Sequence, residues 1–188
     1  MNPEQKPAPT IRRATIADAA ALSAFAASVF PLGCPGTAPA DLAAHIATEL
    51  PPERFLTMLD DPNIIVMLAE ASLAQVRSIV AYIVVARRSP HPVIAAPSPA
   101  EFRKLYVDPA YHGTGLASAL IHCGLSILSA EGPRPVWLSV FSGNPRGIAF
   151  YKKWGFEIAG TQEYIVGNDH QKDFVMQLES ARSPIADS

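Results

Sequence analysis

The chain shows two hydrophobic periodicities in succession, and the change from one to the other predicts the order of its helices and strands. Before residue 61 apolar positions such as Leu22, Phe25 and Val29 recur every three to four residues, which is typical of helices that bury one face. A strand is predicted first, followed by three helices, at 11–15, 18–30, 40–50 and 51–61. Asp18 is expected to cap the first helix, because its carboxylate can accept from free N–H groups of the first turn.

From residue 63 the pattern changes to β-branched runs of strand length. An antiparallel pair is predicted at 63–70 and 75–88, then a Pro-rich loop, a strand at 101–109, a helix at 114–130, a strand at 135–142, a short helix at 144–156 and a closing hairpin at 157–179. This order predicts one α/β domain, with a single mixed, mostly antiparallel central sheet, a parallel strand–helix–strand crossover and flanking helices. The domain is expected to span 11–178, between a flexible N-terminal segment, 1–10, and a flexible C-terminal tail, 179–188.

Composition narrows the class of protein. The chain has 188 residues, 49% of them apolar, and a formal net charge of -2, which argues against general disorder and against nucleic acid as a partner. Cys34 and Cys123 are too few for a disulfide framework and are expected to be free thiols, with no metal site. The first ten residues lack the apolar core of a signal peptide, and no stretch approaches a membrane span, so a cytoplasmic protein without a membrane partner is expected.

A glycine pair marks the candidate chemistry. In "VDPAYHGTGLASALI", Gly113 and Gly115 open an apolar helix after a strand and a turn. A Rossmann site would need its glycines directly after the strand and an acidic residue after the next strand, where "VFSGN" stands. A P-loop would need Lys-Ser/Thr where Leu116 and Ala117 stand. Both dinucleotide and triphosphate sites are therefore disfavoured.

A different phosphate ligand fits the same physics. The amides of Gly113, Thr114, Gly115, Leu116 and Ala117 lie at a helix N-terminus, where the dipole favours an anion. Glycine at two positions leaves room for a diphosphate, and an extended arm of the ligand could pair with the upstream strand "KLYV". The alternative is a helix start that merely turns tightly.

The context of the glycines carries a resemblance to a known family. "HGTGLA" at 112–117 and "SGNPRGIAFYKKWGF" at 142–156 resemble the two motifs of the GNAT acyl-CoA-dependent N-acyltransferases, and the element order is similar over about Ile11 to Leu178. The resemblance implies acetyl-CoA as co-substrate and an amine as acceptor. His112 departs from it, since the family usually has Arg or Gln there, and a neutral imidazole replaces that charge only in part.

The resemblance also implies roles for single residues. The backbone of Leu105 and Val107, on either side of Tyr106, would pair with pantetheine, and an N–H near Val107 would polarise the thioester carbonyl. Asn144 would contact the pantetheine arm, or cap the helix that follows it, or both. Tyr151 would be the general acid for the leaving thiolate, with a place in an aromatic core as the alternative.

Glu101 is the candidate general base, because of its position in the sequence. Glu101 opens the strand before the glycines and, without a bulge, would share a face with Arg103 and Leu105. Its carboxylate could take a proton from the amine through water. The alternative is a surface ion pair with Arg103 or Arg87.

The acceptor is less defined by the sequence. The closing "GNDHQKDFVM" resembles the bacterial GNAT branch that includes polyamine acetyltransferases, so a small-molecule amine, polyamine-like, is expected. Asp173 reads as a carboxylate that could attract a cation or as ordinary surface charge. The alternatives are a peptide or protein amino group and an acyl-CoA-binding module without turnover. The final hairpin leaves an edge strand, and many relatives are dimers, so a homodimer is expected.

Overall fold

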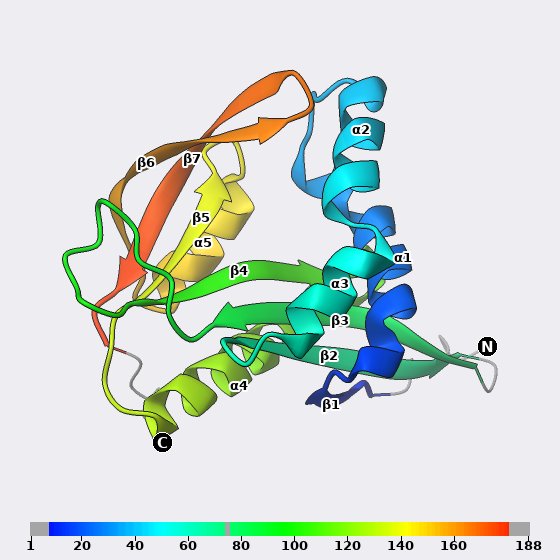
Figure 1. The fold of residues 1–188 in the computed structure, drawn as a ribbon, viewed down its shortest axis with the longest axis horizontal. Helices are drawn as coiled ribbons and strands as arrows, with labels where there is room; N and C mark the ends of the chain where they lie inside the picture. The colour runs from blue at the N-terminus through cyan, green and yellow to red at the C-terminus, as the bar shows by residue number, and fades with distance from the viewer. Residues whose placement is uncertain (1–7, 74–75, 181–188) are drawn as a thin grey trace.

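The strands of the described residues join one seven-stranded sheet, in the order β1-β2-β3-β4-β5-β7-β6 (Figure 1). The computed structural model describes residues 8–73 and 76–180. The strands are β1 Thr10–Arg13, β2 Ile64–Leu73, β3 Val76–Ala86, β4 Ala100–Val107, β5 Val136–Phe141, β6 Glu157–Val166 and β7 Asp169–Leu178. Every neighbouring pair is antiparallel except β4 and β5, which are parallel. The predicted mixed, mostly antiparallel sheet is confirmed.

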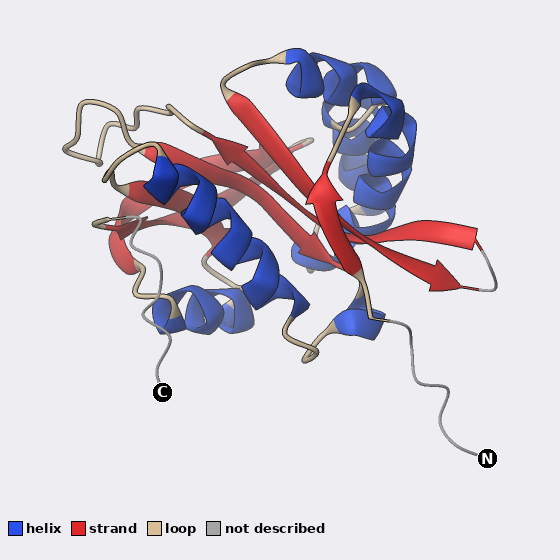
Figure 2. Ribbon diagram, turned by 90° about the horizontal axis from the view of Figure 1, so that it is seen from below, coloured by secondary structure: helices blue, strands red, loops and turns tan. Residues whose placement is uncertain are grey.

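Helices cover both faces of this sheet (Figure 2). They are α1 Ala19–Val29, α2 Pro39–Glu49, α3 Pro52–Asp60, α4 Leu116–Ala130 and α5 Pro145–Lys153, with 3-10 turns η1 Ile16–Asp18, η2 Phe30–Gly33 and η3 Pro109–Tyr111. The helix α4 joins the parallel strands β4 and β5, which confirms the predicted crossover.

The core consists of two apolar layers, because successive residues of β3 point to opposite faces of the sheet. Ile83 packs with the α4 residues Leu120 and Leu125 on one face, and Tyr82 packs with Leu22 and Phe55 of α1 and α3 on the other. Each of these side chains is at most 1% exposed. A large apolar side chain removed from water contributes roughly 1.5–3 kcal/mol, so the two layers hold the sheet rigid between the helices.

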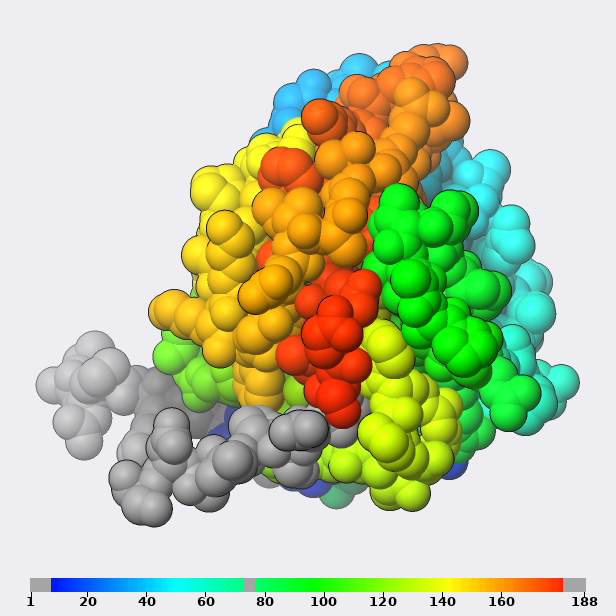
Figure 3. Space-filling model, turned by 90° about the vertical axis from the view of Figure 1, so that its left-hand side faces the viewer, coloured from blue at the N-terminus to red at the C-terminus, as the bar shows by residue number. Residues whose placement is uncertain are grey.

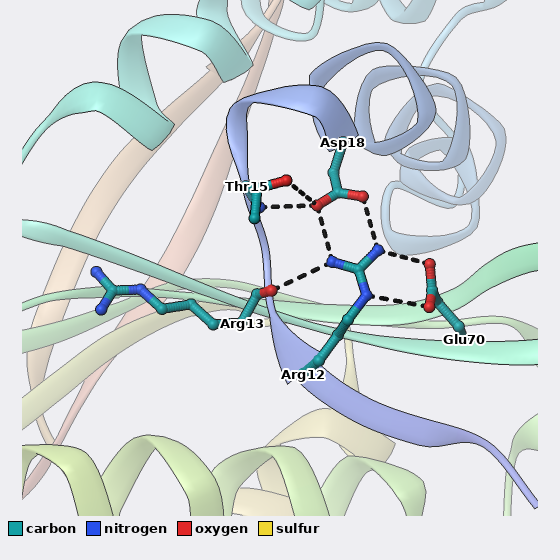
Figure 4. A network of polar contacts seen from close by, with 5 residues as sticks. All are labelled: Arg12, Arg13, Thr15, Asp18 and Glu70. Atoms are coloured by element: carbon teal, nitrogen blue, oxygen red, sulfur yellow. Dashed lines mark hydrogen bonds and ion pairs between the residues drawn. The ribbon is translucent and has the colours of Figure 1, made fainter.

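A cluster of charged side chains fastens β1 to the start of α1 (Figure 4). The Arg12 guanidinium contacts Asp18 at 2.7 Å and Glu70 of β2 at 2.6 Å. Asp18 also accepts the Thr15 N–H at 2.7 Å, and the hydrogen bond from Arg12 holds the pKa of its carboxyl well below the usual range. The expectation that Asp18 caps α1 through first-turn amides is therefore corrected, since its oxygens face backward to Thr15 and Arg12.

The expectation that no stretch of the chain approaches a membrane span in length and composition is also corrected. The stretch Ile16–Gly33 has a mean hydropathy of 1.5 over 18 residues and could cross a membrane by length and composition alone. In the fold it is divided among η1, α1 and η2, and Leu22, Ala26 and Phe30 are buried in the core. The flexible segments predicted at 1–10 and 179–188 lie largely outside the described residues, and β1 already begins at Thr10.

The parallel strands β4 and β5 separate soon after they meet. They pair only at Ala100 with Val136 and Glu101 with Trp137, and β4 then runs on to Val107 without β5 beside it. A bulge leaves Arg103 without a partner in β3. Phe102 lies opposite Val85, and Lys104 lies opposite the adjacent residue, Val84, so Arg103 is the extra residue of β4. The bulge reverses the alternation, so Glu101 and Leu105 do not share a face as predicted. The gap between the strands is where the candidate site lies.

The β6–β7 hairpin leans over the sheet toward α2 (Figure 1). Asn168 at its tip donates its backbone N–H to Asp41 of α2 at 2.9 Å, and Thr37 before α2 donates to Asp169 at 2.6 Å. On the opposite side, the loop between β3 and β4 lies beside the hairpin (green and orange in Figure 3), where His91 contacts Gln162 at 2.8 Å. The hairpin is thus tied down on both sides.

Candidate active site

Three adjoining cavities follow the gap between β4 and β5. The first, here the loop groove, has a volume of about 500 Å³ and lies at the start of α4 between Gly113 and Arg146. The second, the arm groove, has about 290 Å³ and shares Val107 and Arg146 with the first. The third, the transfer cleft, has about 160 Å³ and shares Asn144 and Tyr151 with the second. The shared walls make one path across the sheet.

The glycine turn forms the floor of the loop groove. Gly113 and Gly115 have φ angles of +79° and +85°, a left-handed conformation that side-chain-bearing residues adopt only with strain. A Cβ at either position would meet open space, so the backbone conformation requires these glycines, not contact within the chain. Leu116, the first residue of α4, and Ala117 line the groove and lie at the positive end of the helix dipole.

Thr114 differs from its neighbours in the turn. Its N–H and its hydroxyl both donate to the carbonyl of Tyr111, at 3.4 Å and 2.8 Å. Thr114 therefore closes the turn. Unlike the other residues of the predicted phosphate-binding turn, Gly113, Gly115, Leu116 and Ala117, it does not line the loop groove.

The edge of β4 is open along the path. Asp108 donates its N–H to Val80 of β3 at 2.8 Å, so Val107 and Ala81 form a non-hydrogen-bonded pair. The N–H and C=O of Val107 therefore point away from β3, toward the gap that β5 has left, and those of Leu105 do the same. Tyr106 lies between them with its backbone toward β3 and its ring stacked on Tyr82, at 5.7 Å between centroids.

His112 connects this edge to α5. Its Nε2 lies 3.0 Å from the carbonyl oxygen of Val107, and its Nδ1 lies 2.9 Å from Nη1 of Arg146. Both His112 and Arg146 line the loop groove and the arm groove. Lys153, further along α5, lines the loop groove as well, so two cations face the glycine turn from this helix.

Asn144 lies where the arm groove meets the transfer cleft. Its Oδ1 accepts the Gly147 N–H at 2.8 Å, which confirms the predicted cap of α5. Within the described residues, no hydrogen bond engages its Nδ2. The two functions predicted for Asn144 are therefore geometrically compatible.

Tyr151 borders the same junction. Its ring packs edge-on against Phe150 and Phe156, at 5.3 Å and 5.9 Å between centroids, as the aromatic-core alternative required. Burial raises the pKa of its hydroxyl to about 12. Among the described residues nothing hydrogen-bonds this hydroxyl, so a phenol that keeps its proton at neutral pH is available to a ligand in the cleft.

Glu101 lies elsewhere. Its carboxylate accepts Ser89 Oγ at 2.6 Å and Arg103 Nε at 2.9 Å, at the end of β4 that still pairs with β5. Of the ion pairs offered as alternatives, the one with Arg103 is present, and Arg87 instead contacts Glu131 at 2.7 Å. Glu101 lines none of the three cavities that the described residues form along the path.

Asp173 is the carboxylate that the structure brings to the transfer cleft. It is 5% exposed, and its Oδ1 has no hydrogen-bond partner in the described chain. Burial raises the pKa of this carboxyl, and a hydrogen bond from the Ser139 side chain opposes the shift. The sequence holds only a faint signal for this, because Asp173 stands in the polar first half of the strand, two residues before the apolar Val175 on the same face.

Lys104 is a charged residue of the site for which the sequence analysis gave no signal. It lines the transfer cleft and a neighbouring hollow of about 430 Å³, the acceptor hollow, which is also bordered by His45 and Glu49 of α2. Burial lowers the pKa of the Lys104 ammonium group, although nearby Glu49 opposes this. No ion pair engages Lys104 among the described residues, so its charge faces the acceptor side.

Cys34 lines the transfer cleft together with Gln171. Cys34 and Cys123 are free, and burial raises the pKa of the Cys34 thiol. The described part of the chain brings together no group of three or more His, Cys, Asp or Glu residues that could hold a metal ion.

Comparison with known proteins agrees with this geometry. The sequence profile of the Acetyltransferase (GNAT) family matches residues 38–156. An uncharacterized N-acetyltransferase of Mycobacterium tuberculosis is 38% identical over 163 residues, which cover 86% of this chain and 97% of that protein. Two solved structures superpose over 92% of this chain and 99% of their own. They are PaiA N-acetyltransferase from Thermoplasma acidophilum in complex with coenzyme A, with a TM-score of 0.71 and 20% identity, and Arabidopsis thaliana NAA60 in complex with a bisubstrate analogue, with a TM-score of 0.70 and 16% identity. The chain therefore belongs to the GNAT family, as an N-acetyltransferase that uses acetyl-CoA as its co-substrate.

Proposed function

We propose that this enzyme moves the acetyl group of acetyl-CoA directly to a primary amine of a small molecule. The observation that carries the proposal is the series of three adjoining cavities from the glycine turn to the transfer cleft, where Tyr151 and Asp173 line one space beside the open edge of β4. A diphosphate at one end and a thioester at the other fit such a path.

The backbone would hold the co-substrate. Amides at the start of α4, with those of Gly113 and Gly115, would bind the diphosphate. The outward-facing groups of Leu105 and the carbonyl of Val107 would pair with the amides of pantetheine, and the free Nδ2 of Asn144 would donate to the same arm. The Val107 N–H would then stabilise the oxyanion that forms when the thioester carbonyl is attacked.

Two protons must move during transfer. The acceptor arrives as an ammonium with a pKa near ~10 and must lose a proton before its nitrogen can attack the thioester carbon. The C–N bond forms, the nitrogen loses a second proton as it becomes an amide, the C–S bond breaks, and the thiolate takes a proton. Tyr151 would donate the proton to the thiolate, since its raised pKa keeps the phenol protonated until the thiolate appears, and the second proton from the nitrogen would restore the phenol.

Two carboxylates compete for the role of base. Glu101 is the sequence-based prediction, but its carboxylate is engaged by Ser89 and Arg103. Asp173 lines the transfer cleft with one oxygen unbonded, and its raised pKa makes it a stronger proton acceptor than an exposed aspartate. The geometry therefore favours Asp173, directly or through water.

The acceptor remains to be identified by experiment. A small amine suits the acceptor hollow, because the hairpin tie between Asp41 and Asn168 borders that side. The polyamine assignment rests on the resemblance of the closing hairpin, and Lys104 would repel a second cation held close to it. A peptide amino group is the alternative acceptor, with NAA60 as a neighbour in fold only.

We also propose a cytoplasmic location and a homodimer, as the sequence predicts. The homodimer would use β6, one of the two edge strands of the described sheet, on which Ile158 and Ile165 are 45% and 49% exposed. Sedimentation velocity would show a single monomer-sized species if this is wrong.

The test is release of free thiol from acetyl-CoA by the purified protein, over spermidine, spermine, amino acids, aminoglycosides and short peptides. Release with small amines supports the proposal, and polyamines as the best substrates would support the finer assignment. Release with peptides alone would move the acceptor to protein amino groups. No release with any acceptor, despite stabilisation by acetyl-CoA, would contradict a small amine of these classes as substrate.

A further inference from the structure

Arg146 carries a positive charge in the first turn of α5, the end of the helix where a cation is unfavourable. Arg146 is the second residue of α5, directly after Pro145. The N-terminus of a helix carries partial positive charge, so an arginine in the first turn is unfavourable by roughly 0.3–1 kcal/mol. The first turn of α5 holds no acidic residue, and no ion pair engages Arg146 in the described part of the chain. Helix stability therefore does not account for this residue.

The ring of His112 has a defined protonation state because of its two partners. The Val107 carbonyl can only accept, so Nε2, 3.0 Å away, carries the hydrogen. Arg146 can only donate, so Nδ1, 2.9 Å from Nη1, presents its lone pair. His112 is thus a neutral imidazole, with its tautomer assigned from these contacts. It holds the guanidinium in place and brings no charge of its own.

The same face of α5 carries further groove residues. Arg146, Phe150 and Lys153 recur at helical spacing and all line the loop groove opposite Gly113 and Gly115. Two cations therefore face the amides of the glycine turn across one cavity. An anion placed between them would meet backbone donors on one side and charged side chains on the other.

We infer that Arg146, held by His112 and assisted by Lys153, supplies the side-chain contact to the diphosphate of acetyl-CoA that an Arg or Gln at the position of His112 usually supplies in the family, and that it brings the positive charge that an Arg there would bring. A guanidinium suits this role, because its planar donor fork matches phosphate oxygens. Arg146 is the binding residue, and His112 is a positioning residue that acts through it. The inference rests on the acetyl-CoA site described above and changes which element provides its charge.

The first experiment compares Arg146→Ala with wild type on two thioesters. Calorimetry with CoA is expected to show about 10- to 100-fold weaker binding, and the KM for acetyl-CoA is expected to rise by a similar factor. S-acetylpantetheine lacks the diphosphate, so its KM is expected to stay within about twofold. Lys152→Ala is the matched control, because it removes an exposed cation of α5 that does not line the groove.

The second experiment separates positioning from binding. His112→Phe is expected to weaken CoA binding less than Arg146→Ala does, and the double variant is expected to be no weaker than Arg146→Ala alone. In the Arg146→Ala background, His112→Arg is expected to restore much of the lost affinity by returning the charge to the position usual in the family.

Several outcomes would overturn the inference. Unchanged CoA affinity in Arg146→Ala would do so, and so would an equal loss with S-acetylpantetheine, which would indicate general damage to the site. Additive losses in the double variant would remove His112 from the positioning role. Calorimetry with CoA needs no acceptor, so the inference is tested even if the acceptor class proposed above is wrong.

Discussion

Asp41, in the first turn of α2, accepts two hydrogen bonds from Asn168 at the tip of the β6–β7 hairpin, both at 2.9 Å and across 127 residues of sequence. The approach is close enough to exclude a side chain beside it. A Cβ on Gly167 would lie 2.5 Å from Asp41 Oδ1 and 2.6 Å from its Cα, and the φ of Gly167 is +62°. The acceptor side therefore depends on a glycine for both its turn and its contact.

Gly167→Ala is expected to destabilise the protein by roughly 2–4 kcal/mol, because left-handed strain and overpacking against Asp41 add together. Gly132→Ala is the control, since its φ is +112° but a Cβ there meets nothing within 4 Å. It should cost only the strain, about 1–2 kcal/mol. Urea denaturation measures both, and equal losses would show that the contact with Asp41 contributes nothing.

Tyr151→Phe is expected to lower kcat by about 10²-fold or more while leaving CoA affinity nearly unchanged, because the phenol acts only when the thiolate leaves. The hydroxyl has no hydrogen bond among the described residues, so the melting temperature should hardly move. Tyr82→Phe is the control, since it removes a buried hydroxyl that has no hydrogen-bond partner in the described chain, from a residue that lines none of the cavities of the site. A kcat equal to that of wild type would remove Tyr151 from the acid role.

The pH dependence of kcat follows from the Tyr151 pKa of about 12. A group with this value stays protonated through the usual assay range, so the wild-type kcat should show no alkaline decline from its acid up to about pH 10. Steady-state rates with a saturating acceptor test this. A fall in kcat with a midpoint near pH 8 would mean that another group supplies the proton.

Asp173→Asn is expected to lower kcat/KM by about 10²-fold, and Glu101→Gln by much less, because only Asp173 lines the transfer cleft. Assays at several pH values with one acceptor compare the two. The reverse order of losses would return the base to Glu101.

The same substitution should stabilise the fold above the acid range. The pKa of Asp173 is raised by burial, so its carboxyl binds a proton more tightly in the folded chain than in the unfolded chain. The free energy of unfolding therefore falls as pH rises from the unfolded value, about 3.9, through the raised folded value. Asp173→Asn removes this loss, so its melting temperature should exceed that of wild type at pH 7–8 and match it at low pH. A lower melting temperature at pH 7–8 would contradict a destabilising carboxylate.

Lys104→Met should change which acceptors are preferred. Without the ammonium group in the cleft, the KM for spermidine is expected to fall roughly 5-fold and the KM for amines that carry a carboxylate to rise by a similar factor, as for a screened charge pair worth about 1 kcal/mol. Lys172→Met removes a lysine from β7 that lines none of the described cavities and serves as the control. Identical changes of KM in both variants would mean that the overall charge of the protein, and not Lys104, determines which acceptors are preferred.

Local patterns predicted most of the fold because they act locally. The β-branched run around Ile83 and the helical spacing of Leu120 and Leu125 each bury one face, and the structure uses them so. The bulge at Arg103 escaped prediction, because neither glycine nor proline marks it and only pairing with β3 reveals it. That single extra residue removed the expected shared face of Glu101 and Leu105.

The site was predictable where the backbone demands a residue type and not where distant segments meet. Gly113 and Gly115 are required by their φ angles, so their spacing carried the signal. Arg146 reads as an ordinary helix surface cation until His112 is seen beside it. Asp173 reads as surface charge on a closing strand, and only the parting of β4 from β5 shows that it faces an interior space.

Because β4 and β5 pair only at Ala100 and Glu101, the rest of β4 has an unpaired edge in the middle of the sheet, here called the slot. Exposed edges attract other strands, and the usual defences are charges, prolines or short length. In this protein the defence is enclosure, because residues of α5 and of the β6–β7 hairpin both line the transfer cleft beside the slot. A strand of another protein would have to displace these elements before it could pair with β4, so the open edge of β4 is protected by its neighbours within the fold.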